Sequence, residues 1–91
     1  MHDRAMRVLI PNPLRSYTAN APIVMAAGKT LDELASDLDR RYPGMRFRVI
    51  DEQGAIRPHI KFFVNGAQKQ SLSEPVSDSD EVMIVCALSG G

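Results

Sequence analysis

One helical segment limits the folds open to this chain of 91 residues. Thr30 and Glu33 have the spacing of a capping box, which predicts that a helix begins directly after Thr30. The apolar residues that follow recur every three or four positions and therefore share one face of that helix. They are Leu31, Leu34, Ala35 and Leu38, with Tyr42 close to the same stripe. Pro43 and Gly44 end the helix. A single helix of this kind needs a sheet to cover its apolar stripe, which predicts a two-layer domain.

Apolar or alternating runs on both sides of the helix supply that sheet. We expect strands at 7–10, 23–26, 45–49, 60–64 and 81–88, and a short one around Ser71 and Leu72. Pro11 to Pro13 ends the first strand in a turn, and Asn65-Gly66 is a strong turn pair after 60–64. The first two strands are close enough to form an antiparallel hairpin with a long loop.

The first and last strands are the most continuous apolar runs of the chain. Parallel central strands read as unbroken apolar runs, so we expect these two to lie side by side and parallel in the middle of the sheet. The predicted class is therefore α+β with the β-grasp arrangement: a mixed sheet of four or five strands packed on one main helix.

Composition excludes several classes of function. Eleven basic and eleven acidic residues give a net charge of zero, which supplies no basic field for nucleic acid. No apolar run approaches the ~20 residues that a membrane-spanning helix needs, and the N-terminus lacks an apolar signal-peptide core. We therefore expect a cytoplasmic single domain, 1–91, that binds neither nucleic acid nor membrane. Its length argues against a cleft that encloses both a substrate and a cofactor.

The residues capable of chemistry do not form a catalytic or metal-binding pattern. His2, His59 and Cys86 have no metal-ligand spacing, so no metal site is predicted. His59 is expected in a turn at the surface, and Cys86 as a small packing residue of the last strand. The acidic stretch 78–81 is typical of a solvated turn rather than of a calcium loop. The arginines at 40, 41, 46, 48 and 57 form either a docking patch for an acidic partner or a solvated face.

The chain ends in Gly90 and Gly91, preceded by the uncharged Leu88 and Ser89. Residues 87–91 are expected to form a flexible tail. Its two glycines can pass through a slot too narrow for any Cβ, and they present the carboxylate of Gly91. That carboxylate is ionised at neutral pH and can attack the α-phosphate of ATP. Once adenylated, its carbonyl is open to attack by sulfur or an amine.

Several segments in this order resemble one known family. They are the first strand up to Pro11, Leu14 to Tyr17, the capped helix from Thr30, Phe62 to Gly66, Asp78 to Val82, and Ala87 to Gly91. Together they resemble the ubiquitin-like sulfur carriers of the MoaD/ThiS family, and most closely the cysteine-biosynthesis carriers. The five residues before Met6 lie outside the family pattern, and Met6 is an alternative start.

The resemblance implies a β-grasp carrier, not an enzyme, with a thiocarboxylate at Gly91. An ATP-dependent adenylyltransferase of the ubiquitin-activating type would charge Gly91, and a sulfur-accepting synthase would use the product. No cofactor would be bound, and ATP would be used by the activating partner. Many family members have a proline in the tail, whereas this chain has Cys86 to Ser89. The acceptor pathway stays open among cysteine, molybdopterin, thiamine and a specialised metabolite.

Two other functions fit the same terminus. The chain could be a ubiquitin-like protein modifier that joins Gly91 to lysines of target proteins. It could also be a non-covalent β-grasp interaction module in which the two glycines are incidental. The sequence does not separate a modifier from a carrier, since both need the same tail.

Alternation along the strands predicts which side chains meet a partner. Four residues should face the helix as core: Phe62, Val64, Val82 and Ile84. Phe63, Met83 and Val85 should then lie on the open face of the sheet. An exposed apolar patch of this kind is typical of a partner site.

Overall fold

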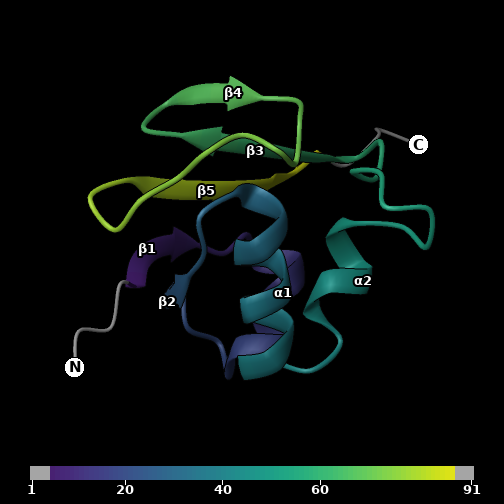
Figure 1. The fold of residues 1–91 in the computed structure, drawn as a ribbon. Coiled ribbons are helices and arrows are strands. Elements are labelled where there is room, and N and C mark those ends of the chain that lie inside the picture. The colour runs from purple at the N-terminus through teal and green to yellow at the C-terminus, as the bar shows by residue number, and fades with distance from the viewer. Residues whose placement is uncertain (1–4, 88–91) are drawn as a thin grey trace.

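The computed structural model describes residues 5–87 as one five-stranded sheet with helices packed against one of its faces (Figure 1). The elements in chain order are β1 (Ala5–Leu9), the 3₁₀ helix η1 (Asn12–Thr18), β2 (Ile23–Ala27), α1 (Leu31–Arg41), α2 (Met45–Val49), β3 (Ile60–Val64), β4 (Ala67–Lys69) and β5 (Glu81–Cys86). The strands lie in the order β2-β1-β5-β3-β4. The predicted α+β class with a mixed sheet on one main helix is confirmed.

The first and last strands are neighbours, as predicted. β1 and β5 run parallel, with Val8 opposite Val82 and Leu9 opposite Met83. On its other side β5 pairs antiparallel with β3, so that both of its edges are hydrogen-bonded. The predicted hairpin is also confirmed, because β1 and β2 pair antiparallel around the loop that contains η1. β2 and β4 are left as the edge strands.

Helix α1 begins where the capping box predicts. The side-chain oxygen of Thr30 accepts a hydrogen bond from the N–H of Glu33 at 3.2 Å, and the Glu33 carboxylate accepts one from the N–H of Lys29 at 2.9 Å. The residues of the apolar stripe are at most 1% exposed: Leu31, Leu34, Ala35 and Leu38. In the described part of the chain, no helix is long and apolar enough to cross a membrane.

The strand predicted at 45–49 is wrong, because these residues form the short helix α2. Met45 and Val49 are fully buried, whereas Phe47 is 55% exposed. A spacing of four residues puts Met45 and Val49 on one face of a helix, and the same residues also fit the alternation of a strand. Gly44 takes a left-handed conformation, with φ of 97°, at the point where the chain turns from α1 into α2.

The short strand also lies elsewhere than predicted. β4 covers 67–69, directly after the Asn65-Gly66 turn, and both turn residues have positive φ. Leu72 is in a loop, where its carbonyl accepts a hydrogen bond from the N–H of Asp32 at 2.9 Å. The segment 71–76 therefore supplies carbonyl acceptors to the N–H groups of the first turn of α1 instead of extending the sheet.

The core lies between the sheet and the helices. The four strand residues predicted to face the helix are all buried, at 7% exposure or less: Phe62, Val64, Val82 and Ile84. They belong to the same cluster as the apolar stripe of α1 and the buried residues of β1, β2, η1 and α2. The alternation along β3 and β5 is therefore confirmed on its inward side.

Replacing Thr30 by Ala removes the oxygen that caps the first turn of α1. We expect the free energy of unfolding to fall by about 1 kcal/mol, the usual contribution of such a cap. Denaturant unfolding measures the loss. Thr30→Ser keeps the hydroxyl and is the matched control. An equal loss in both variants would show that the cap is not the cause.

Candidate functional site

The face of the sheet turned away from the helices carries a group of apolar side chains. Register aligns Leu9, Met83 and Phe63 across the three central strands, and Ile23 of the edge strand lies opposite Leu9. Val85 lies on the same face, two residues after Met83 in β5. We call these five residues the open-face patch. It includes Phe63, Met83 and Val85, the residues that the sequence predicts for a partner surface.

The patch is partly accessible to solvent. Ile23 is 41% and Met83 37% exposed, whereas Leu9, Phe63 and Val85 are half-buried. Four large hydrophobic residues in the described part of the chain are exposed, and Ile23 and Met83 are two of them. An apolar surface gathered on one face is the usual core of a protein interface.

Charged side chains border the open-face patch. Arg7 and Glu81 lie opposite each other in the next row, 3.7 Å apart, and both are well exposed. An exposed ion pair of this kind contributes little to stability. Lys61 lies opposite Val85 at the other end of the patch. The result is an apolar centre with a charged rim, which is the anatomy of a protein interface.

The central strand leads from the open-face patch toward the chain terminus. After β5, the N–H of Ala87 donates to the carbonyl oxygen of His59 at 2.7 Å, so the backbone is held next to β3 up to this residue. The predicted carrier residue Gly91 lies outside the described residues, as do Gly90, Ser89 and Leu88 of the predicted tail. The patch therefore lies on the strand from which that tail continues.

A polar turn fixes the start of β5. Asn65 accepts a hydrogen bond from the N–H of Glu81 at 2.9 Å and donates one to the Asp80 carboxylate at 2.8 Å. The amide of Asn65 and the N–H of Ser77 lower the pKa of Asp80, because both donate to its ionised form. The acidic stretch 78–81 is thus the turn that the sequence predicts. Residues 5–87 contain no group of side chains that could hold a metal ion.

The remaining candidate residues that the structure describes, His59 and Cys86, have the positions expected of residues without a chemical role. His59 is exposed in the turn before β3, as predicted. Cys86 is a free thiol, half-buried against the core at the end of β5. His2 lies outside the described residues.

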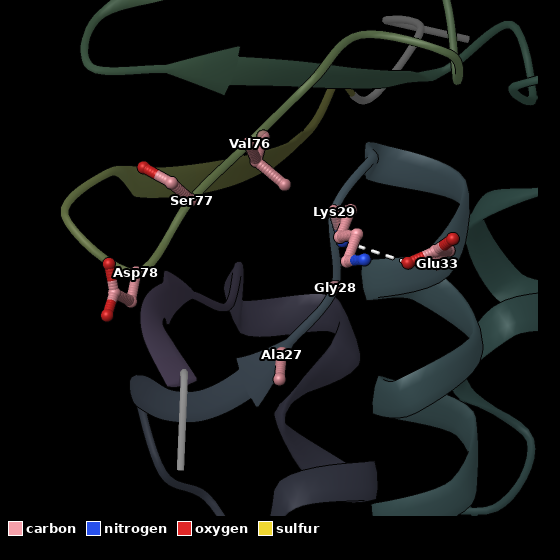
Figure 2. A pocket seen from close by; sticks show the side chains of 7 residues that line it. All are labelled: Ala27, Gly28, Lys29, Glu33, Val76, Ser77 and Asp78. Carbon is pink, nitrogen blue, oxygen red and sulfur yellow. Dashed lines mark hydrogen bonds between the residues drawn. The ribbon is translucent and has the colours of Figure 1, made fainter. Parts of the chain in front are cut away.

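An open pocket of about 700 Å³ lies between the first turn of α1 and the loop before β5 (Figure 2). Its lining is Ala27, Gly28, Lys29, Glu33, Val76, Ser77 and Asp78. The first N–H groups of α1 are already used, since Leu31 donates to Glu74 and Asp32 to Leu72. With these donors occupied, the pocket offers no helix-terminal site for an anion.

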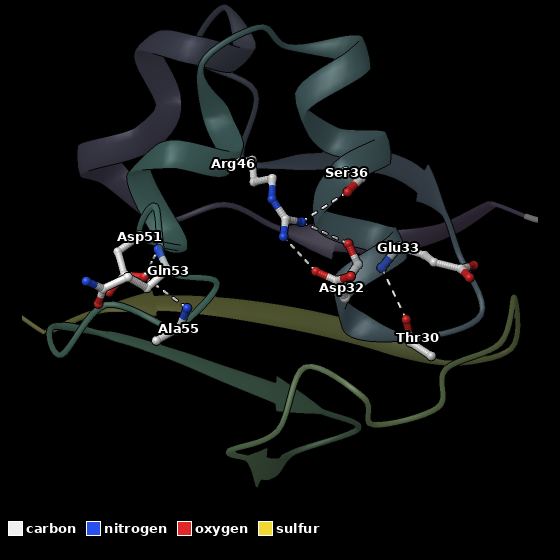
Figure 3. A network of polar contacts seen from close by, with 8 residues as sticks. All are labelled: Thr30, Asp32, Glu33, Ser36, Arg46, Asp51, Gln53 and Ala55. Carbon is white, nitrogen blue, oxygen red and sulfur yellow. Dashed lines mark hydrogen bonds and ion pairs between the residues drawn. The ribbon is translucent and has the colours of Figure 1, made fainter.

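Most of the arginines singled out in the sequence contact their own chain. Arg40 and Arg41 both pair with Asp37, at 2.6 and 2.8 Å. Arg46 pairs with Asp32 at 2.7 Å (Figure 3). Partial burial by itself would raise the pKa of Asp37, but the Ala27 N–H and the two guanidinium groups outweigh it and lower that pKa. These contacts favour a solvated face over a docking patch for an acidic partner.

The fold and its open face define the class of protein. A five-stranded mixed sheet on one main helix, with a parallel central pair, is the ubiquitin-like β-grasp fold. A model of the ThiS family matches residues 8–91, and the chain belongs to that family. The predicted resemblance is therefore confirmed.

Three known proteins show the extent of the similarity. The sulfur carrier protein CysO of Mycobacterium tuberculosis is 33% identical over 89 residues, which cover 92% of this chain and 96% of the relative. A chain in the crystal structure of the Amycolatopsis orientalis BexX/CysO complex is 31% identical, covers 96% of this chain and all of its own, and has a TM-score of 0.87. SAMP1 of Haloferax volcanii, at 23% identity and a TM-score of 0.80, covers 96% of this chain and 99% of its own and shows the fold alone.

Two residues of the open-face patch were missed in the sequence. Leu9 stands in a continuous apolar run, which gives no sign of which residues face outward. Ile23 also stands in a continuous apolar run, Ile23 to Ala27, so the sequence has no alternation that separates it from the buried Val24. Both residues join the patch only because β1 pairs with β5 on one side and with β2 on the other.

The two faces of β5 should respond differently to truncation. Ile84 is 2% exposed, and Ile84→Ala should lower the free energy of unfolding by about 2–5 kcal/mol. Met83→Ala, one residue away on the open face, should cost about 0.5 kcal/mol or less. Denaturant unfolding of both variants makes the comparison. Equal losses would contradict the assignment of the two faces.

Proposed function

We propose that this chain is a sulfur carrier protein that holds sulfur as a thiocarboxylate at Gly91. One observation carries the proposal: the ThiS family match runs through residue 91 and so includes the terminal glycine pair. The similarity to CysO, which is itself described as a sulfur carrier protein, supports it over nearly the whole chain. In this proposal the chain supplies the reacting carboxylate and its partners supply the catalysis.

The chemistry requires two transfers. A carboxylate oxygen of Gly91 attacks the α-phosphate of ATP, pyrophosphate leaves, and an acyl adenylate forms. Sulfide from a donor then attacks the acyl carbon, and AMP leaves with its bonding electrons. The product is a thiocarboxylate, whose sulfur is a nucleophile for the acceptor substrate. An adenylyltransferase of the ubiquitin-activating type would perform the activation, and a synthase would accept the sulfur.

The tail sequence suits delivery into a partner's active site. Gly90 and Gly91 have no Cβ, so they fit a narrow channel, and glycine adopts backbone conformations that other residues avoid. Leu88 and Ser89 precede them without a charge to desolvate. The proposed flexible tail, 87–91, begins at Ala87, whose N–H donates to the carbonyl oxygen of His59 beside β3.

The open-face patch is the proposed docking surface for these partners. It lies on the strand that continues into the tail, so one protein could cover the patch and receive Gly91 at the same time. The crystal structure of the Amycolatopsis orientalis BexX/CysO complex supports the idea that carriers of this kind bind partner proteins. The charged rim around the patch would orient the partner.

The thiocarboxylate can be detected directly. We expect incubation with ATP, a sulfide source and the adenylyltransferase of the same genome to replace one oxygen of the carrier by sulfur. Intact-mass analysis measures the change. The chain without Gly91 is the matched control and should keep its mass. No mass change with any activating enzyme of that genome would contradict the proposal, and Gly-Gly remnants on cellular lysines would favour a protein modifier instead.

Truncation within the patch should weaken docking without unfolding the carrier. We expect Phe63→Ala to raise the dissociation constant for the activating enzyme about tenfold or more, because aromatic side chains at the centre of an interface dominate binding. Calorimetric titration measures the constant, and the melting temperature should change little.

Phe47→Ala is the matched control, since Phe47 is 55% exposed but belongs to α2. It should leave the dissociation constant unchanged. If Phe47→Ala raised the dissociation constant more than Phe63→Ala, the docking surface would lie on the helical side of the molecule instead.

A further inference from the structure

The outer edge of β2 presents backbone groups that the fold does not use. In the antiparallel pair of β1 and β2, the N–H of Ile10 donates to the carbonyl of Pro22 at 2.8 Å. Because the direction of the backbone N–H and C=O groups alternates along a strand, those of Val24 and Ala26 also point toward β1. Ile23 and Met25 then direct their N–H and C=O groups to the free edge.

Both ends of this edge are closed by the chain itself. The N–H of Ala27 donates to the Asp37 carboxylate at 2.8 Å. At the other end, the N–H of Ala21 donates to the Thr18 carbonyl at 3.0 Å, and the carbonyl of Ala21 accepts from the Thr18 hydroxyl at 2.9 Å. Apart from the strand pairing itself, no hydrogen bond among residues 5–87 involves the backbone groups of Ile23 or Met25. A short stretch with two donors and two acceptors remains.

The edge also lacks the usual protection against strand pairing. Edge strands are normally guarded by a charged side chain, a bulge or a proline that faces outward. Residues 16–28 contain no charged residue. The backbone of Pro22 faces β1 and not the free edge, so this proline does not block pairing there. Ile23 is 41% and Met25 44% exposed, so the edge is apolar on its open side.

We propose that β2 pairs antiparallel with β2 of a second copy of this chain, about a two-fold axis at Val24. Ile23 then lies opposite the partner's Met25, and Met25 opposite the partner's Ile23. Each pair exchanges two hydrogen bonds, so the N–H and C=O groups of Ile23 and Met25 are satisfied in both copies. The two sheets become continuous, with Ile23 and Met25 packed across the junction on the open face.

The closed ends of the edge select this register. With Met25 opposite the partner's Met25, Ile23 would need the N–H of the partner's Ala27, which Asp37 already occupies. With Ile23 opposite the partner's Ile23, Met25 would need the groups of the partner's Ala21, which Thr18 occupies. Of these three registers, only the pairing about Val24 satisfies the groups of both Ile23 and Met25.

A second copy fits this edge better than a charged partner segment. The free groups complement themselves under a two-fold axis, which is the usual symmetry of homodimers. β2 has no charged side chain of its own to attract a charged strand, and the Asp37 carboxylate at its end is already paired with Arg40 and Arg41. The contact is short and buries less than the ~1,200 Å² of stable interfaces, so the dimer forms weakly and reversibly.

Sedimentation measurements on the full chain from about 10 µM to about 1 mM test the proposal. We expect the mass to rise reversibly from the 10.0 kDa monomer toward the dimer. Met25→Lys puts a charge at the junction and should raise the dimer dissociation constant at least tenfold. Met83→Lys puts the same charge on the same face, but in β5, and should change the constant less than twofold.

Amide hydrogen exchange by NMR identifies the surface. The amides of Ile23 and Met25 should gain protection as the dimer forms, whereas that of Val24, already bonded to β1, should not change. A monomer at every concentration would overturn the proposal. So would a dimer that Met83→Lys disrupts and Met25→Lys spares, which would mean contact through the open face. Protection of Ile23 and Met25 only after addition of another protein would assign the edge to that protein and equally overturn self-pairing.

Discussion

The parallel pairing of β1 with β5 is the interaction on which the rest of the structure depends. It brings the last strand of the chain into the middle of the sheet, between β1 and β3. A strand bonded on both edges is held more firmly than an edge strand, so the chain stays in register up to Ala87. The proposed tail therefore begins from a strand that is bonded on both edges.

A central position also gives β5 one buried face and one partly exposed face, with different tasks. Val82 and Ile84 join the core under α1, whereas Met83 and Val85 face outward beside Phe63. Because side chains alternate strictly, a slip of one residue would exchange core and surface along the whole strand. The Asn65 contacts with Asp80 and Glu81 fix the start of β5, and thereby fix which residues face outward.

The sequence predicts much of this framework because its signals are local. The capping box at Thr30 and the stripe of α1 hold within a single element, and the alternation of β3 and β5 assigns their faces. The helix α2 was missed because five residues, from Met45 to Val49, satisfy a strand period and a helix period equally well. β4 was missed because its three residues have no apolar alternation. The open-face patch needs the strand order, since Leu9 and Ile23 reach Met83 only through pairing.

The strand order also separates the two surfaces proposed for this molecule. The docking residues centre on β5 and β3, whereas the self-pairing edge belongs to β2, with β1 between them. A second copy on the β2 edge would extend the sheet sideways and leave the open face of β5 uncovered. Ile23 belongs to both surfaces, because its side chain lies on the open face and its backbone on the edge. The two kinds of partner would therefore meet at this residue and where Met25 lies opposite Arg7 of the charged rim.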